Sequence, residues 1–73
     1  MTPNELSPGD RFMTQYGSEE RIFRVVGNNT EVGYLIAHWG GFGGTTTRLT
    51  YKDLKDKGFI LLPKRKWYQI FEL

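Results

Sequence analysis

The chain has 73 residues, no cysteine and a formal net charge of +2. Its length limits it to one small domain, and the lack of cysteine excludes disulfides and thiolate metal sites. Because no apolar run approaches the roughly 20 residues of a membrane-spanning helix and no secretory signal pattern is visible, we expect a small, soluble, intracellular protein.

Charge is distributed unevenly along the chain. Residues 1–20 carry one arginine against four acidic residues, a net charge of −3, whereas residues 21–50 carry +2 and residues 51–73 carry +3. The acidic first part and the basic last part predict a molecule with two differently charged faces. A dedicated nucleic-acid-binding protein of this length is usually far more basic.

The first half of the chain predicts three strands separated by turns. The expected strands cover residues 11–15, 21–27 and 31–39. The expected turns, where proline, glycine or asparagine provides the required backbone conformation, lie at residues 8–9, 17–18 and 27–29. Alternate residues of the third strand are apolar on both faces, which predicts a central strand covered on both sides.

The second half predicts two further strands with one short helix between them. The strands are expected at residues 45–51 and 59–63. Thr50 is the expected N-cap of the helix, and Gly58 is the expected glycine at its C-terminal end. The helix therefore has about two turns, which corresponds to residues 51–57.

These elements predict a mainly β fold with one short helix. We expect a compact β domain over residues 1–63 and a basic, aromatic tail over residues 64–73, whose residue spacing fits a helix and a strand equally well. Five short strands joined by tight turns favour an SH3-like barrel. A small antiparallel sheet carrying one helix is the alternative.

Residues that carry catalysis or bind metals are scarce. With His38 as its one histidine and no cysteine, the chain offers no nucleophile–base set and no set of metal ligands. We expect His38 to form local hydrogen bonds. The acidic pairs are expected to be solvated: Glu19 with Glu20, and Asp53 with Asp56. The sequence therefore predicts a protein that is not an enzyme and needs no cofactor or metal.

The glycine-rich stretch HWGGFGG, residues 38–44, invites comparison with phosphate-binding loops. A P-loop requires a lysine and a serine or threonine at the start of a helix, and the dinucleotide-binding motif requires a βαβ unit. Neither is present, so a flexible hairpin tip is expected. Trp39 and Phe42 either pack back against the core or contact a partner, because large exposed apolar groups usually mark interaction sites. We take both as candidate contact residues.

The tail is the second candidate contact region. Its basic run, Lys64, Arg65 and Lys66, precedes Trp67 and Tyr68. Basic residues beside aromatic rings suit single-stranded nucleic acid and also suit a protein interface. Alternatively, the basic run is a solvated corner and the apolar residues of the tail complete the core. The candidate contact residues here are the basic run and Tyr68.

Three stretches carry a resemblance over the full length of the chain: MTPNELSPGDRF, HWGGFGG and KRKWYQIFEL. In them the chain resembles the small transcription regulators of lytic phages, such as one that infects Xanthomonas. The resemblance implies a phage protein that binds host bacterial RNA polymerase in the cytoplasm of the bacterial host. We expect it to be a monomer. It further implies that binding prevents sigma-dependent promoter recognition, with antitermination as an additional action. A small β-barrel that binds nucleic acid is the alternative.

Overall fold

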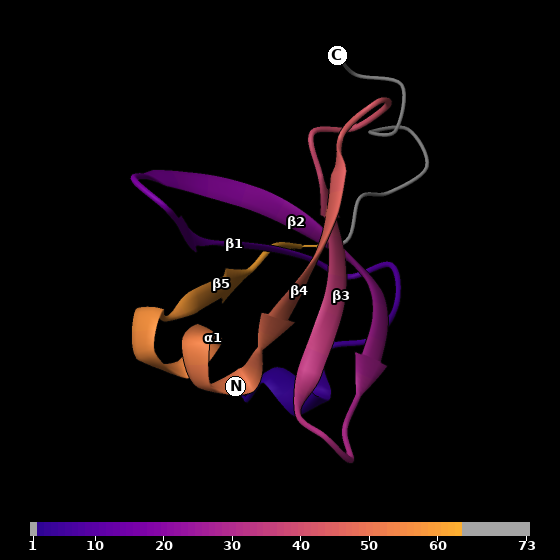
Figure 1. Ribbon diagram of the computed structural model, residues 1–73, viewed down its shortest axis with the longest axis vertical. Coiled ribbons are helices and arrows are strands. Elements are labelled where there is room, and N and C mark those ends of the chain that lie inside the picture. Colours follow the sequence, from indigo (N-terminus) through magenta and orange to yellow (C-terminus); the bar gives the residue numbers. More distant parts are fainter. Residues whose placement is uncertain (1, 64–73) are drawn as a thin grey trace.

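The computed structural model describes residues 2–63 as one five-stranded antiparallel sheet with two short helices (Figure 1). In chain order the elements are η1 (Pro3–Glu5), β1 (Arg11–Tyr16), β2 (Glu19–Asn29), β3 (Tyr34–Trp39), β4 (Thr45–Thr50), α1 (Tyr51–Lys57) and β5 (Phe59–Leu61). The strand order is β4-β3-β2-β1-β5. Within residues 2–63, β4 and β5 are the edges of the sheet and do not pair with each other. Of the two predicted architectures, the open antiparallel sheet with one α-helix therefore forms, and not the barrel.

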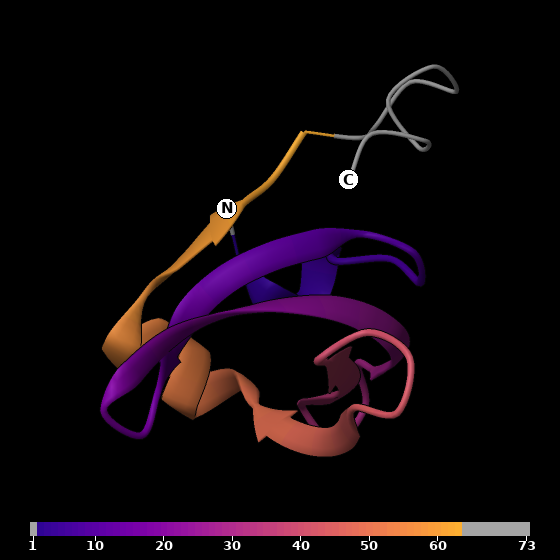
Figure 2. The same cartoon turned by 90° about the horizontal axis from the view of Figure 1, so that it is seen from above.

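One face of the sheet, called here the inner face, is buried. Its buried side chains come from all strands except β5: Phe12, Phe23, Val25, Leu35, Ala37 and Leu49. Leu6, just after η1, and Leu54, from α1, complete this core. Figure 2 shows how strongly the sheet curves, with the β1–β2 pair running across the direction of the β3–β4 pair. Because Leu6 and Leu54 belong to this core, both short helices lie against the inner face.

The helix α1 has the predicted bounds and the predicted caps. The Thr50 side chain accepts a hydrogen bond from the backbone N–H of Asp53, and Gly58 ends the helix with a φ of 79°. Each cap satisfies a backbone group that a helix end leaves unpaired. The strands β1, β4 and β5 also agree with their predicted ranges to within two residues.

The turn predicted at residues 27–29 is wrong, because β2 continues through this segment to Asn29. The Asn28 side chain donates hydrogen bonds to the carbonyl oxygens of Pro3, at 3.1 Å, and Leu6, at 2.7 Å. It also accepts one from the Tyr51 hydroxyl. Asparagine favours turns when it bonds to its own backbone neighbours, but here partners from distant segments hold it in a strand.

The prediction that the third strand is covered on both sides is also wrong. Only the face of β3 that carries Leu35 and Ala37 is buried, and the face that carries Tyr34, Ile36 and His38 is partly exposed. Since η1 and α1 both pack on the inner face, no helix or strand within residues 2–63 covers the other side. We call this second side the outer face.

Candidate docking surface

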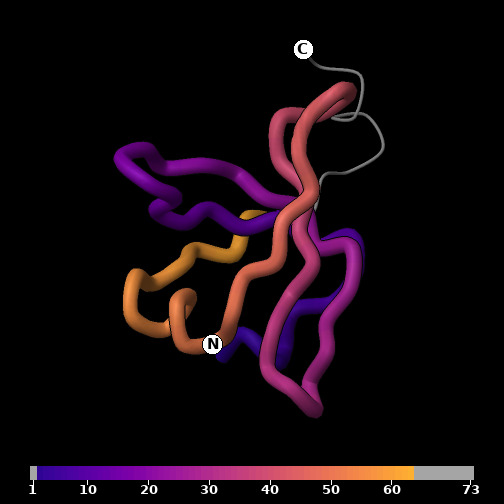
Figure 3. Tube along the Cα trace, in the orientation of Figure 1, coloured from indigo at the N-terminus to yellow at the C-terminus, as the bar shows by residue number. Residues whose placement is uncertain are grey.

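The glycine-rich loop, residues 40–44, is the tip of the hairpin formed by β3 and β4 (Figure 3). Two hydrogen bonds meet at the carbonyl oxygen of Gly41, one from the backbone N–H of Gly44, at 3.0 Å, and one from the His38 ring, at 2.7 Å. A Cβ atom on Gly44 would lie 2.0 Å from the backbone oxygen of Trp39. The loop is therefore a hairpin tip, as predicted, and its close backbone approach requires glycine.

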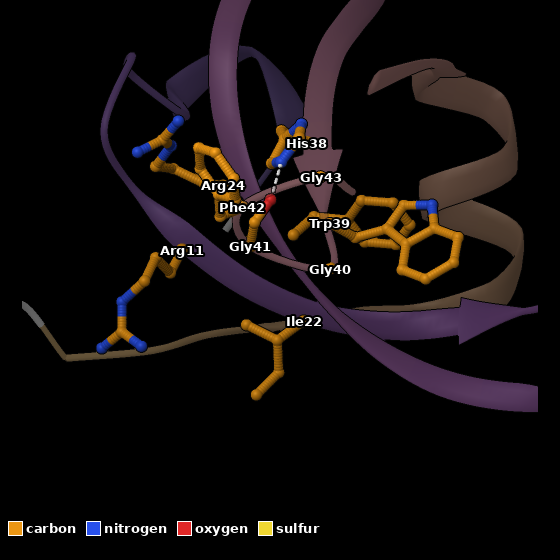
Figure 4. Close-up of a pocket in the computed structure, with 10 residues that line it drawn as sticks. Arg11, Ile22, Arg24, His38, Trp39, Gly40, Gly41, Phe42 and Gly43 are labelled. Carbon is orange, nitrogen blue, oxygen red and sulfur yellow. Dashed lines mark hydrogen bonds between the residues drawn. The ribbon is translucent and has the colours of Figure 1, made fainter. Parts of the chain in front are cut away.

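The two aromatic residues near the tip lie in opposite environments. Trp39 is half-buried and packs against the core, and the Arg21 guanidinium lies 3.8 Å from its ring centroid. Phe42 is fully exposed. Figure 4 shows the Trp39 ring pointing away from His38 and Arg24. Of the two alternatives considered for these residues, Trp39 packs back against the core and Phe42 is left open to a partner.

His38 has the local hydrogen bonds that the sequence predicts. Its Nε2 atom bonds to the carbonyl oxygen of Gly41, and its Nδ1 atom lies 3.0 Å from the Thr46 hydroxyl. With Nε2 as the donor, Nδ1 is the acceptor for the hydroxyl. The ring thus links β4 to the tip and helps to set the position of Phe42.

An open groove of about 720 Å³ lies beside the tip (Figure 4). Phe42 and three glycines of the tip line the groove, and so do Arg11, Ile22 and Arg24 of the sheet. The strand register explains why these residues meet. Arg11 lies directly opposite Arg24, and Arg24 lies directly opposite His38 on the next strand.

The two arginines have no acidic partner in the part of the chain that the structure describes. The one ion pair there joins Arg21 to Glu19, at 3.3 Å. The guanidinium group of Arg11 donates a single hydrogen bond, at 3.2 Å, to the carbonyl oxygen of Pro63. Arg11 is partly buried and Arg24 is exposed. Like charges directly opposite one another destabilise a sheet, and within residues 2–63 no acidic side chain compensates this cationic pair.

Nothing in the order of the residues marks Arg11, Arg24 or Ile22 as a contact residue. Arg11 belongs to the segment with a net charge of −3, and its cationic neighbour on the sheet lies 13 positions away in the chain. The signal that would reveal the pair is the register of β1 against β2, which fixes the side chains that stand together.

Residues 2–63 bring no set of potential metal ligands together. No group of three histidine, cysteine, aspartate or glutamate side chains lies close enough there to hold a metal ion. The acidic pairs are exposed, as predicted: Glu19, Glu20, Asp53 and Asp56. None of the helices between residues 2 and 63 is long and apolar enough to cross a membrane.

The remaining candidate contact residues belong to the tail. Lys64, Arg65, Lys66 and Tyr68 lie outside the described residues, so the division of the chain into residues 1–63 and 64–73 stays a prediction.

Compared with known proteins, the chain matches no protein-family model, no curated protein and no solved structure. Its function is therefore inferred from its surface chemistry and from the resemblance of its sequence.

Proposed function

We propose that this protein is a phage-encoded regulator that binds host bacterial RNA polymerase and, without catalysing a reaction, prevents sigma-dependent promoter recognition. The observation that carries the binding function is the fully exposed side chain of Phe42 at the end of a hydrogen-bonded loop. An aromatic side chain presented in this way is a typical anchor of a protein interface. The resemblance to small phage regulators supplies the partner.

The described part of the chain suits a protein that acts by occupying a surface. An interface of standard size takes about 800 Å² from each partner, which is a large share of the surface of so small a domain. The tip is closed by its own hydrogen bonds, so little conformational freedom is lost when it docks. Docking then prevents sigma-dependent recognition by steric exclusion. Antitermination follows if the protein stays bound during elongation.

The test compares Phe42→Ala with Val32→Ala in binding to immobilised, purified bacterial core polymerase. Val32 is the matched control, because it is 74% exposed in a different turn of the molecule. Removing an aromatic anchor weakens binding by about tenfold or more, and we expect the control to bind within about twofold of the wild type, since most interface and surface truncations are nearly neutral.

Transcription in vitro provides the functional readout of the same variants. Wild-type protein is expected to inhibit initiation from a sigma-dependent promoter, and Phe42→Ala is expected to inhibit only at correspondingly higher concentration. A termination assay on the same template measures the second expected action. Wild-type protein that binds no core polymerase would overturn the proposed function.

Nucleic-acid binding is the second candidate, and the pairing of Arg11 with Arg24 across the sheet is the observation that favours it. Its distinguishing property is salt dependence, because each phosphate that a protein neutralises releases counterions and steepens the loss of affinity with salt. A filter-binding titration with single-stranded DNA and RNA at low salt separates the two functions. Absence of binding at low salt would dismiss this candidate.

A further inference from the structure

We propose that the outer face of the sheet, beside the glycine tip, docks an acidic amphipathic segment of the polymerase. The proposal rests on the proposed function and adds the surface used and the chemistry of the segment recognised. Two rows of side chains define this surface. The arginine row consists of Arg11, Arg24 and His38, and the aliphatic row consists of Ile60, Met13 and Ile22.

The arginine row is set by the pairing of β1, β2 and β3. Directly opposite residues of an antiparallel sheet stand on the same face with Cβ atoms about 5 Å apart, so the register places Arg11, Arg24 and His38 side by side. Glu20 is the acidic residue of the same face, but it lies opposite Gln15, about 13 Å along β2 from Arg24. Within residues 2–63 the positive charge of this row is therefore not neutralised.

On β1 and β2 the aliphatic row lies two residues away from the arginine row, and it continues onto β5 instead of β3. Met13 is opposite Ile22 on β2 and opposite Ile60 on β5. Ile22 is 52% exposed and Ile60 is 59% exposed. The two rows are about 7 Å apart, because a strand rises about 3.4 Å per residue.

The glycine tip stands beside the two rows. Phe42 lines the groove together with Arg11, Ile22 and Arg24 (Figure 4). An occupant of the groove therefore meets an aromatic side chain, aliphatic side chains and two guanidinium groups within one surface. His38 holds the tip in this position through the carbonyl oxygen of Gly41.

An occupant that contacts all these groups favourably is a peptide segment with acidic side chains on one side and apolar side chains on the other. A helix is about 10 Å wide, so a helix lying along the rows covers both of them. Its carboxylates meet Arg11 and Arg24, and its apolar side chains meet Ile22 and Phe42. Recognition of an amphipathic helix in an apolar groove is an established mode of peptide binding, and arginine pairs well with carboxylates.

Other occupants fit this surface less well. Phosphates would neutralise the arginines and one base could stack on Phe42, but a nucleic acid has nothing apolar to place against the aliphatic row. A second copy of the chain around a two-fold axis would bring this face against itself and place arginines near arginines. The tail follows Pro63, which accepts a hydrogen bond from Arg11, but it starts with three further positive charges at residues 64–66.

The central experiment compares two double variants that change the net charge equally. Arg11→Glu with Arg24→Glu alters the arginine row, whereas Lys52→Glu with Lys55→Glu alters exposed positions on α1. Binding to purified bacterial core polymerase is measured for both and for the wild type. We expect about a hundredfold loss of affinity for the arginine variant and a change within about threefold for the helix variant, since exposed rim charges contribute little.

Two further variants keep the test valid if the charge reversal impairs folding. Arg11→Gln with Arg24→Gln removes the charges without adding like charges, and Ile22→Ser with Ile60→Ser alters the aliphatic row alone. Each is expected to lose about tenfold in affinity, whereas Val32→Ser, at an exposed position in a different turn, is expected to bind like the wild type.

The outcomes separate this proposal from the proposed function. Wild-type protein that fails to bind polymerase overturns the proposed function and this proposal with it. Wild-type protein that binds, with arginine variants that bind as well as the helix variant, overturns the assignment of the surface alone.

Three other results would assign the outer face to a different occupant and overturn the proposal. A single-stranded oligonucleotide that binds the wild type but not the arginine variant would indicate nucleic acid. A dimer in sedimentation that the same variant dissociates would indicate a second copy. A shift of the Arg11 and Arg24 amide resonances in Glu72→Gln would indicate the tail.

Discussion

The two faces of the sheet are built from alternate residues of the same strands, and they differ in almost every respect. Phe23 is fully buried on the inner face, whereas its chain neighbour Ile22 is half exposed on the outer face. The inner face stacks Phe12 on Phe23 with ring centroids 5.6 Å apart. The outer face places Arg11 opposite Arg24.

This difference indicates that the inner face stabilises the fold and that the outer face is available for binding. The two short helices suffice to cover one face, so the inner side chains provide the hydrophobic stabilisation. The outer side chains contribute little to folding and remain available for a partner. Substitutions at consecutive positions of one strand should therefore affect different properties, stability on one face and binding on the other.

The strongest test of this division is the pair Phe23→Ala and Ile22→Ala. Truncating a buried phenylalanine costs about 3–5 kcal/mol, and Phe23 also loses its edge contact with Tyr16. Truncating the exposed Ile22 is expected to change the free energy of unfolding by no more than about 0.5 kcal/mol. Urea denaturation measures both, and equal losses would show that the outer face is covered.

Gly44→Ala tests whether the tip depends on its close backbone approach. A Cβ atom at this position overlaps the Trp39 carbonyl oxygen, so the loop has to move at a cost of about 1–3 kcal/mol. Gly27→Ala is the control, because a Cβ atom there meets nothing within 4 Å. Thermal unfolding compares the two variants, and equal melting temperatures would contradict the tip geometry.

Thr50→Ala tests the cap of the helix that covers the inner face. Loss of the hydrogen bond to the Asp53 backbone N–H is expected to destabilise the protein by about 1 kcal/mol. Thr30→Ala, in the exposed turn between β2 and β3, provides the matched control. Should both variants unfold at the same urea concentration, α1 contributes nothing through its cap.

The smallest effect on stability is expected from Arg24→Gln, which should raise the stability of the fold and weaken binding. Removing one of two facing arginines relieves a repulsion, which should stabilise the protein by about 0.2–1 kcal/mol. The proposed binding to polymerase should weaken in the same variant. Arg48→Gln is the control, since Arg48 faces Ile36 and lies 5.4 Å from the centroid of the Tyr34 ring. A loss of stability in Arg24→Gln would indicate that the arginine pair supports the fold.

The sequence predicted best the features that depend on neighbouring residues. The helix α1 was predicted with its bounds and both caps, because Thr50 and Gly58 act within one turn of the helix ends. The strands β1, β4 and β5 were also located to within two residues. The turn predicted at residues 27–29 was wrong, because Asn28 bonds to Pro3 and Leu6, more than 20 positions away.

In the candidate site, too, the sequence predicted the features that depend on neighbouring residues and missed those that depend on distant ones. A glycine-rich tip with aromatic residues was evident from the order of residues. Which aromatic residue is exposed depended on the packing: Trp39, at the end of β3, packs against the core, and Phe42 lies in the tip beyond the strands. The sequence did not predict the arginine row, because charge summed along the chain places Arg11 in an acidic segment.

The sequence by itself determined a small β domain with one capped helix and a hairpin tip rich in glycine, because local hydrogen bonds and backbone freedom fix these features. Only the tertiary structure decided that the sheet stays open, that Phe42 is exposed while Trp39 is packed, and that Arg11 stands beside Arg24. Strand register and sheet order join residues that are distant in the chain, and no local pattern specifies them.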